Sequence, residues 1–201
     1  MKHRPWEQYW QDHMASDFLS HPKYIQHPGR RLAYQTLVDE GGSLLDAGCC
    51  MGRDYLFFIN HGLKYTGIDI TPKFIAAFKE RYPNANVRVA SVLNIPFEDK
   101  AFTSVYSGSV VQHMYPADIP LAIKEMWRVV TNLMILMIPP FVEKESFPRY
   151  DNKIFTNRFN KKRFLKNITN LEVVGSIELK ENIKGFNQSS QTLVIIRKEG
   201  I

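Results

Sequence analysis

The distribution of hydrophobic and polar residues predicts alternating strands and helices from residue 44 onward. Short apolar runs indicate buried strands at residues 44–47, 64–70, 87–90, 103–107 and 133–138. Further strands are expected at residues 171–179 and 192–197, separated by a polar loop that contains Gly185. This order favours an α/β fold in which a parallel sheet lies between two layers of helices.

Capping residues and amphipathic segments predict the helices between these strands. One helix is expected over residues 53–60 and ends near Gly62. Thr71 and Pro72 supply an N-cap and a first-turn proline for the next helix, and Asp118 is expected to cap another. The apolar faces of these last two helices consist of Phe74, Ile75, Phe78 and Tyr82 in the first, and Ile119, Ala122, Ile123, Met126 and Val130 in the second.

The loop after the first strand has the composition of a nucleoside-binding turn. It contains Asp46-x-Gly48-x-Cys50-x-Gly52, and the second strand carries Asp69 near its end. Because parallel strands end at the same edge of a sheet, the loop and Asp69 are expected to face one ligand. Glycine lets the backbone approach that ligand, and a carboxylate can accept hydrogen bonds from a ribose. A dinucleotide site would instead carry Gly-x-Gly-x-x-Gly to hold a pyrophosphate.

The loop resembles the first motif of the class I S-adenosylmethionine-dependent methyltransferases, Asp/Glu-x-Gly-x-Gly-x-Gly. Later segments resemble the same family in the same order, at residues 65–72, 90–97, 102–107, 111–114 and 125–130. The resemblance covers about residues 43–140 and looks like the small-molecule branch that includes quinone-ring methyltransferases. It implies a Rossmann-like three-layer sandwich, with a mostly parallel seven-stranded sheet and an antiparallel C-terminal strand.

The resemblance also implies a site for S-adenosylmethionine, with S-adenosylhomocysteine as the product. Asp69 is expected to hold the ribose, Ser107 to meet the methionyl end, and residues 91–93 to lie along the adenine. The complete set of expected cofactor-binding residues is Asp46, Gly48, Cys49, Cys50, Gly52, Arg53, Asp69, Ile70, Ser91, Val92, Leu93 and Ser107.

Three positions depart from the family pattern. Cys50 replaces the middle glycine, and its small side chain is expected to be tolerated. Ser91 replaces an aspartate beside the adenine, which leaves the backbone amides of Val92 and Leu93 to serve. The usual Pro-Gly-Gly turn before the fifth strand is shortened to residues 131–132. Cys50 and Ser91 are the hints that would favour a non-catalytic module that binds cofactor without turnover.

His113 is the candidate base. Methyl transfer from a sulfonium mainly requires that the acceptor be aligned with the methyl group, so a base is needed only if the acceptor atom carries a proton. His113 follows the fourth strand, and imidazole can take up a proton near neutral pH. Contact with the cofactor, or packing beneath it, would explain this histidine as well. The expected reaction is methylation of a small molecule, with O-methylation slightly favoured over N-methylation.

The family resemblance suggests one methyltransferase domain over residues 1–201 with three parts. Residues 1–42 are expected to form a helical lid, 43–140 the cofactor-binding core, and 141–201 the rest of the sheet and the acceptor region. In the first part a second helix should start near Arg30, after the break at residues 22–29. Ordinary packing would also explain the aromatic stripe in its first helix, which consists of Trp6, Tyr9, Trp10 and His13.

Length and composition indicate the class of protein to which this chain belongs. At 201 residues, 44% hydrophobic and 23% charged, it has the length and composition of a single globular domain. The longest apolar run, residues 133–142, is too short for a membrane helix, and the polar start lacks a signal peptide's apolar core. A cytoplasmic protein is therefore expected. The adjacent Cys49 and Cys50, without nearby ligand partners, predict neither a disulfide framework nor a metal site.

The net charge of +6 leaves open a nucleic-acid acceptor as an alternative to a small molecule. Basic residues gather at residues 158–166, which a nucleic-acid methyltransferase could use to bind phosphates. A solvated helix face explains the same cluster, so a nucleic-acid partner is not the favoured expectation.

Overall fold

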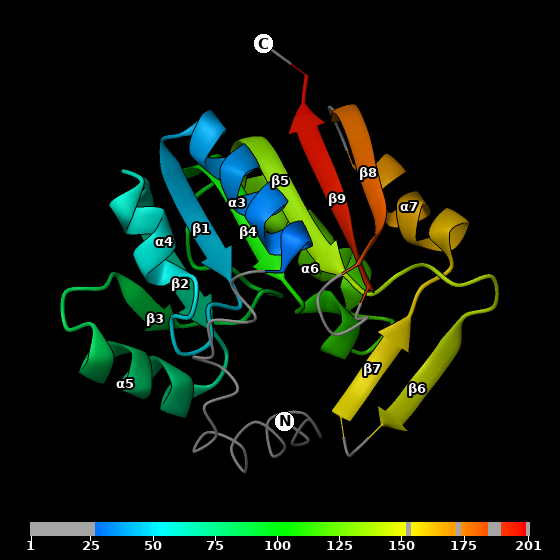
Figure 1. Cartoon of the computed structure of the whole chain (residues 1–201), viewed down its shortest axis with the longest axis horizontal. Coiled ribbons are helices and arrows are strands. Elements are labelled where there is room, and N and C mark those ends of the chain that lie inside the picture. Colours follow the sequence, from blue (N-terminus) through cyan, green and yellow to red (C-terminus); the bar gives the residue numbers. More distant parts are fainter. Residues whose placement is uncertain (1–26, 152–153, 172–173, 185–189, 200–201) are drawn as a thin grey trace.

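The chain folds around one seven-stranded sheet. The computed structural model describes residues 27–151, 154–171, 174–184 and 190–199. Its sheet has the strand order β3-β2-β1-β4-β5-β9-β8 (Figure 1). The strands are β1 Ser43–Ala47, β2 Lys64–Asp69, β3 Val87–Val89, β4 Phe102–Gly108, β5 Val130–Ile138, β8 Val174–Lys184 and β9 Ser190–Lys198.

Strands β1 to β5 pair in parallel, whereas β9 runs antiparallel to both of its neighbours, β5 and β8. The predicted mostly parallel sheet with an antiparallel C-terminal strand is confirmed. The strand expected at residues 171–179 is shifted, because it starts at Val174 and continues to Lys184. The polar segment before Gly185 is therefore partly strand.

Helices cover both faces of the sheet, as the alternation of elements predicted. On one face α3, α4 and α5 pack with Leu44, Tyr65 and Ile135, and on the other α6 and α7 pack with Leu45 and Met134. Neighbouring residues of β1 thus point into opposite cores, as expected for a strand buried on both sides. The helices are α3 Pro28–Glu40, α4 Tyr55–Asn60, α5 Pro72–Arg81, α6 Ile119–Val129 and α7 Lys161–Thr169. No helix of the described ranges is long and apolar enough to cross a membrane.

The helix α3 lies flat against the sheet. It begins at Pro28, where the side chain of His27 accepts a hydrogen bond from the amide of Gly29 at 3.1 Å. Ala33, Tyr34 and Leu37 on its inner face are buried. The expected lid stays a prediction, because Trp6, Tyr9, Trp10 and His13 lie outside the described residues.

The structure contains a hairpin that the sequence did not predict. It consists of β6, Ser146–Asp151, and β7, Ile154–Arg158, paired antiparallel as a separate sheet. Figure 1 shows the hairpin beyond the edge of the main sheet at which the parallel strands end. There β7 packs against η2, a short 3₁₀ helix at Val111–His113.

Candidate functional site

The loop between β1 and α4 contains left-handed backbone at alternate positions. The φ angle is +99° at Gly48, +50° at Cys50 and +79° at Gly52. A Cβ atom on Gly48 would lie 2.2 Å from Cγ2 of Val110, and one on Gly52 would lie 2.5 Å from Cε2 of Phe78. Both glycines are therefore required by backbone conformation and by lack of space.

Cys50, which stands at the position of the motif's middle glycine, adopts left-handed backbone with a φ of +50°. A left-handed residue other than glycine costs about 1–2 kcal/mol. The amide of Cys50 donates a hydrogen bond to Oδ2 of Asp69 at 3.0 Å, which holds this conformation in place. This bond explains how a cysteine is held in left-handed backbone, and the tolerance of Cys50 towards the cofactor stays a prediction.

Asp69 joins the end of β2 to this loop. Its Oδ2 accepts from the amide of Cys50, and its Oδ1 accepts from the amide of Thr71 at 2.9 Å. The amides of Gly48 and Cys49 both donate to the carbonyl of Ile68, at 2.8 and 2.9 Å. The loop and the acid therefore lie side by side, as the order of strands predicted. Ile70, the next residue, is half-buried.

Asp46, the acid of the motif, is buried and bonded to a tyrosine. Its carboxylate accepts a hydrogen bond from the hydroxyl of Tyr65 at 2.8 Å. Burial, reinforced by the nearby charge of Asp54, raises the pKa of Asp46 from 3.8 to about 7. Asp46 thus carries a proton for part of the time near neutral pH.

A buried ion cluster, which sequence reasoning missed, ties α3 to the end of the loop. Arg30 donates through Nη1 to Oδ2 of Asp54 at 2.8 Å, and Arg53 donates through Nε to Oδ1 at 3.2 Å. The same Nη1 lies 3.3 Å from the hydroxyl of Tyr34 and 3.4 Å from that of Tyr106. Burial alone would raise the pKa of Asp54, but the two arginines hold it below its ordinary value. The spacing of Arg30 and Tyr34, one helical turn apart, could have predicted their contact but not the pairing of Arg30 with Asp54.

The segment expected along the adenine follows β3. The amide of Ala90 donates to the carbonyl of Asp69 at 2.9 Å, which brings this segment beside the end of β2. The amide of Leu93 donates to Oγ of Ser91 at 3.1 Å. One of the two amides expected to serve the ligand is therefore occupied, which corrects the expectation for Leu93. The amide of Val92 makes no hydrogen bond within the described part of the chain.

Two further predicted residues lie at or after the end of β4. Ser107 is completely buried, and its Oγ has no hydrogen-bond partner among the described residues. His113 is half-buried in η2. From β7, Nδ2 of Asn157 donates to the carbonyl of Met114 at 2.6 Å, which fixes the hairpin against the segment after β4.

The structure brings the predicted residues together at one edge of the sheet. β1 lies between β2 and β4, so the glycine loop, Asp69 and Ser107 come from adjacent strand ends. A turn with two glycines, a carboxylate and a buried hydroxyl without a hydrogen-bond partner among the described residues suit a ligand with a ribose and a polar amino-acid end. These residues fit S-adenosylmethionine.

Comparisons with known proteins agree with this geometry. Residues 45–137 match the family model described as a methyltransferase domain. A malonyl-[acyl-carrier protein] O-methyltransferase of Serratia marcescens is 29% identical over 101 residues, which are 50% of this chain and 39% of that protein. The enzyme of the same name from Salmonella typhimurium is 25% identical over 153 residues, 72% of this chain and 59% of that protein.

The quinone branch is matched over a shorter region. A demethylmenaquinone methyltransferase of Chlorobaculum tepidum is 32% identical over 69 residues, 34% of this chain and 28% of that protein. The chain thus spans between 28% and 59% of the length of these three relatives. The likeness to quinone methyltransferases is accordingly loose.

Solved structures share the fold. The PH0226 protein from Pyrococcus horikoshii OT3 superposes with a TM-score of 0.72 at 16% identity, over 94% of this chain and 99% of that chain. The 1,6-didemethyltoxoflavin-N1-methyltransferase of Burkholderia thailandensis, solved with 1,6-didemethyltoxoflavin and S-adenosylhomocysteine, gives 0.68 at 15% identity, over 96% and 91%. Motif order, sheet topology and the matched region agree: residues 45–137 match a methyltransferase domain, and the chain has the Rossmann-like fold of these solved structures.

Proposed function

We propose that the chain binds S-adenosylmethionine at the carboxyl ends of β1, β2 and β4 and transfers its methyl group to a small molecule. The observation that carries this proposal is the 3.0 Å hydrogen bond from the amide of Cys50 to Asp69, which joins the glycine loop to an acidic strand end. A carboxylate oxygen can accept more than one hydrogen bond. Asp69 therefore accepts hydrogen bonds from the ribose hydroxyls of the cofactor.

The other cofactor contacts follow from position. The amide of Val92 donates to the adenine edge, and Oγ of Ser107 bonds the polar methionyl end. Leu93 contacts the cofactor through its side chain, because its amide is already bonded to Ser91. Ile70, which follows Asp69, also contributes a side-chain contact. The loop residues assigned to the wall around the methionyl group are Asp46, Gly48, Cys49, Cys50, Gly52 and Arg53.

When bound, the cofactor supplies an electrophilic methyl group on its sulfonium. The residues of the chain then orient the acceptor and shield the reaction from water. His113 lies in η2, five residues after the end of β4, and takes up the proton of a hydroxyl acceptor. This role is specific to acceptors that carry a proton at the reacting atom.

We place the acceptor beside η2 and β7, at the edge of the sheet where the parallel strands end. The bond from Asn157 to the carbonyl of Met114 keeps these two segments together. We favour O-methylation over N-methylation, because two of the relatives are named O-methyltransferases. The nucleic-acid alternative loses support, since Arg163 pairs with Glu145 at 2.6 Å and Lys161 pairs with Glu181, which neutralises part of the basic segment.

A methyl-transfer assay tests this function. The purified protein would be incubated with S-adenosylmethionine labelled in the methyl group and with four acceptor panels. These are thioesters that carry a free carboxylate, phenols, amines, and short RNA or DNA. The proposal predicts label in a carboxylate or phenol. Label in nucleic acid alone would favour the alternative, and cofactor binding without transfer to any panel would favour a non-catalytic module.

A further inference from the structure

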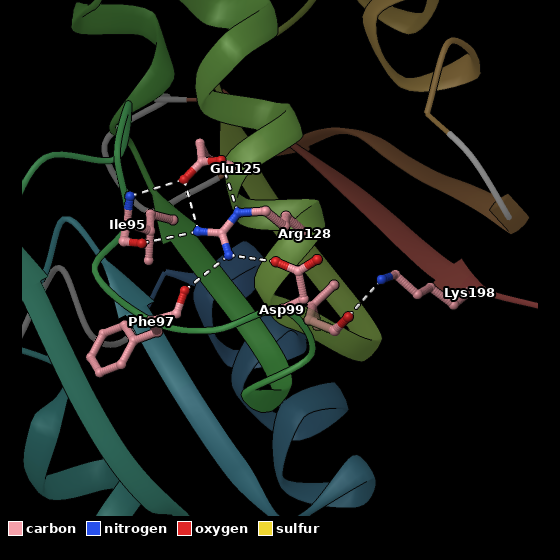
Figure 2. Close-up of polar contacts among 7 residues, drawn as sticks. Ile95, Phe97, Asp99, Glu125, Arg128 and Lys198 are labelled. Atoms are coloured by element: carbon pink, nitrogen blue, oxygen red, sulfur yellow. Dashed lines mark hydrogen bonds and ion pairs between the residues drawn. The ribbon is translucent and has the colours of Figure 1, made fainter.

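Arg128 of α6 is a hydrogen-bonding centre that reaches into the segment before β4 (Figure 2). Its Nε donates to Oε1 of Glu125 at 2.9 Å, and its Nη2 donates to Oε2 of the same residue at 2.9 Å. Its Nη1 donates to the carbonyl of Phe97 at 2.9 Å and to Oδ1 of Asp99 at 2.8 Å. Nη2 also donates to the carbonyl of Ile95 at 3.0 Å. All five N–H groups of the guanidinium therefore have an acceptor.

Glu125 completes this contact from the other side. Its Oε2 accepts the amide of Ile95 at 3.0 Å, so both backbone groups of Ile95 are bonded to the side chains of α6. The hydrogen bond from Arg128 also lowers the pKa of Glu125. We call Glu125 and Arg128 the α6 clamp. The carbonyl of Arg128 accepts from the amide of Lys100 at 2.9 Å, which fixes the far end of the same segment.

The clamped segment has little other backbone structure to hold it. Residues 90–101 connect β3 to β4 and contain no helix or named strand. Apolar contacts fix two side chains of this segment. Ile95 is buried, and the ring of Phe97 packs edge-on against that of Phe102 with 4.9 Å between the ring centroids. The clamp holds the amide of Ile95 and the carbonyls of Ile95 and Phe97. The segment expected along the adenine, residues 91–93, immediately precedes the clamped residues in the chain. The amide of Asn94 donates to the carbonyl of Ser91 at 3.1 Å, which closes a turn between the two segments.

We propose that Arg128, together with Glu125, is a positioning residue for the adenine end of the cofactor site. The clamp holds residues 95–99 in place and thereby presents the amide of Val92 before any ligand arrives. A preformed loop binds more tightly, because the ligand need not order it. Arg128 acts through the loop and not by contact with the cofactor. This inference rests on the proposed function.

The variant Arg128→Gln removes the forked guanidinium and is expected to weaken binding of S-adenosylhomocysteine about tenfold or more. Arg128→Lys keeps the charge but loses the planar fork, so a smaller loss is expected. A matched control is Lys198→Met. Lys198 donates to the carbonyl of Val130 at 2.6 Å beyond the end of α6 and makes no hydrogen bond to residues 91–99 (Figure 2). This control is expected to lower stability without changing affinity.

The test combines calorimetry with amide hydrogen exchange of the unliganded protein. S-adenosylhomocysteine and 5′-methylthioadenosine, which share the adenosine half, serve as probes. The inference predicts that Arg128→Gln weakens both probes by a similar factor. It also predicts faster exchange at the bonded amides of residues 93–95 and of Phe97, with unchanged exchange at Cys49 and Cys50. Arg128→Lys supplies the same readouts if the glutamine variant does not fold.

Two results would overturn the inference: wild-type affinity in a folded Arg128 variant, or a loss for S-adenosylhomocysteine alone, which would locate the effect at the methionyl end. If the wild-type protein bound neither probe, the proposed function itself would fail, and with it the role of the clamp in binding. Unchanged exchange at the amides of residues 93–95 and of Phe97 in the Arg128 variants would separately show that the clamp does not order the loop.

Discussion

The backbone amide of Cys50 donates a hydrogen bond to the carboxylate of Asp69 at 3.0 Å. This bond connects the left-handed position of the glycine loop to the end of the neighbouring strand. One carboxylate thus supports the turn and lies where a ribose is proposed to bind. We therefore expect loop conformation and cofactor affinity to be coupled through Asp69.

Replacing Cys50 tests the cost of its left-handed backbone. Cys50→Gly is expected to be more stable than Cys50→Ala by about 1 kcal/mol, because only glycine adopts this φ without strain. The two variants differ by a single methyl group and serve as each other's control. Urea unfolding measures the difference, and equal midpoints would show that the φ of +50° carries no strain.

Asp46 makes stability depend on pH. Its pKa rises from 3.8 in the unfolded chain to about 7 in the folded protein, so the folded state holds the proton more tightly. The contribution of Asp46 is therefore complete below pH 3.8 and is lost as the pH rises towards about 7, where the folded group ionises.

Asp46→Asn should remove this dependence while keeping an oxygen for the hydroxyl of Tyr65. Relative to wild type, the variant is expected to gain up to about 4 kcal/mol at pH 8 and little at the acid end of the range. Urea unfolding at several pH values measures the difference between the two proteins. A difference that stays constant across these pH values would contradict a raised pKa at Asp46.

Breaking the buried ion cluster should destabilise the fold strongly. Arg30→Met leaves Asp54 buried with weaker compensation and is expected to cost about 3–5 kcal/mol. Arg31, the next residue of α3, is exposed, so Arg31→Met should change stability by less than about 0.5 kcal/mol. Chemical denaturation compares the two variants. Similar effects at both positions would show that the Arg30–Asp54 pair makes no special contribution.

His113→Asn separates the two interpretations of this histidine. If His113 removes a proton from a hydroxyl acceptor, kcat should fall by about 10²–10⁴-fold and the rise of rate with pH should disappear. Affinity for S-adenosylhomocysteine should stay close to wild type. A large loss of affinity with little change in kcat would identify His113 as a cofactor contact instead.

The sequence was informative where local pattern determines structure. The apolar runs predicted β1, β2 and β5, and the parallel order of these strands predicted that Asp69 would lie beside the glycine loop. The hairpin of β6 and β7 was not predicted, because its position depends on contacts with η2, which is distant in the chain. Pro148 also obscures a strand pattern.

Side-chain pairing was harder to predict than the fold. Arg30 and Asp54 are 24 positions apart, and nothing local indicates that they meet. The spacing of Glu125 and Arg128 matched the family, yet their bonds to Ile95 and Phe97 depend on tertiary structure. The bond from the amide of Leu93 to Ser91 could have been predicted, since serine often accepts from the amide two residues later.

Calorimetric titration with S-adenosylhomocysteine tests the central claim most directly. The wild-type protein should bind one equivalent with micromolar affinity, and Asp69→Ala, verified as folded by its thermal transition, should bind at least about tenfold more weakly. Wild-type protein that releases no heat of binding and shows no ligand-induced stabilisation would contradict the cofactor site. Equal affinity in Asp69→Ala would contradict the assignment of the ribose to Asp69.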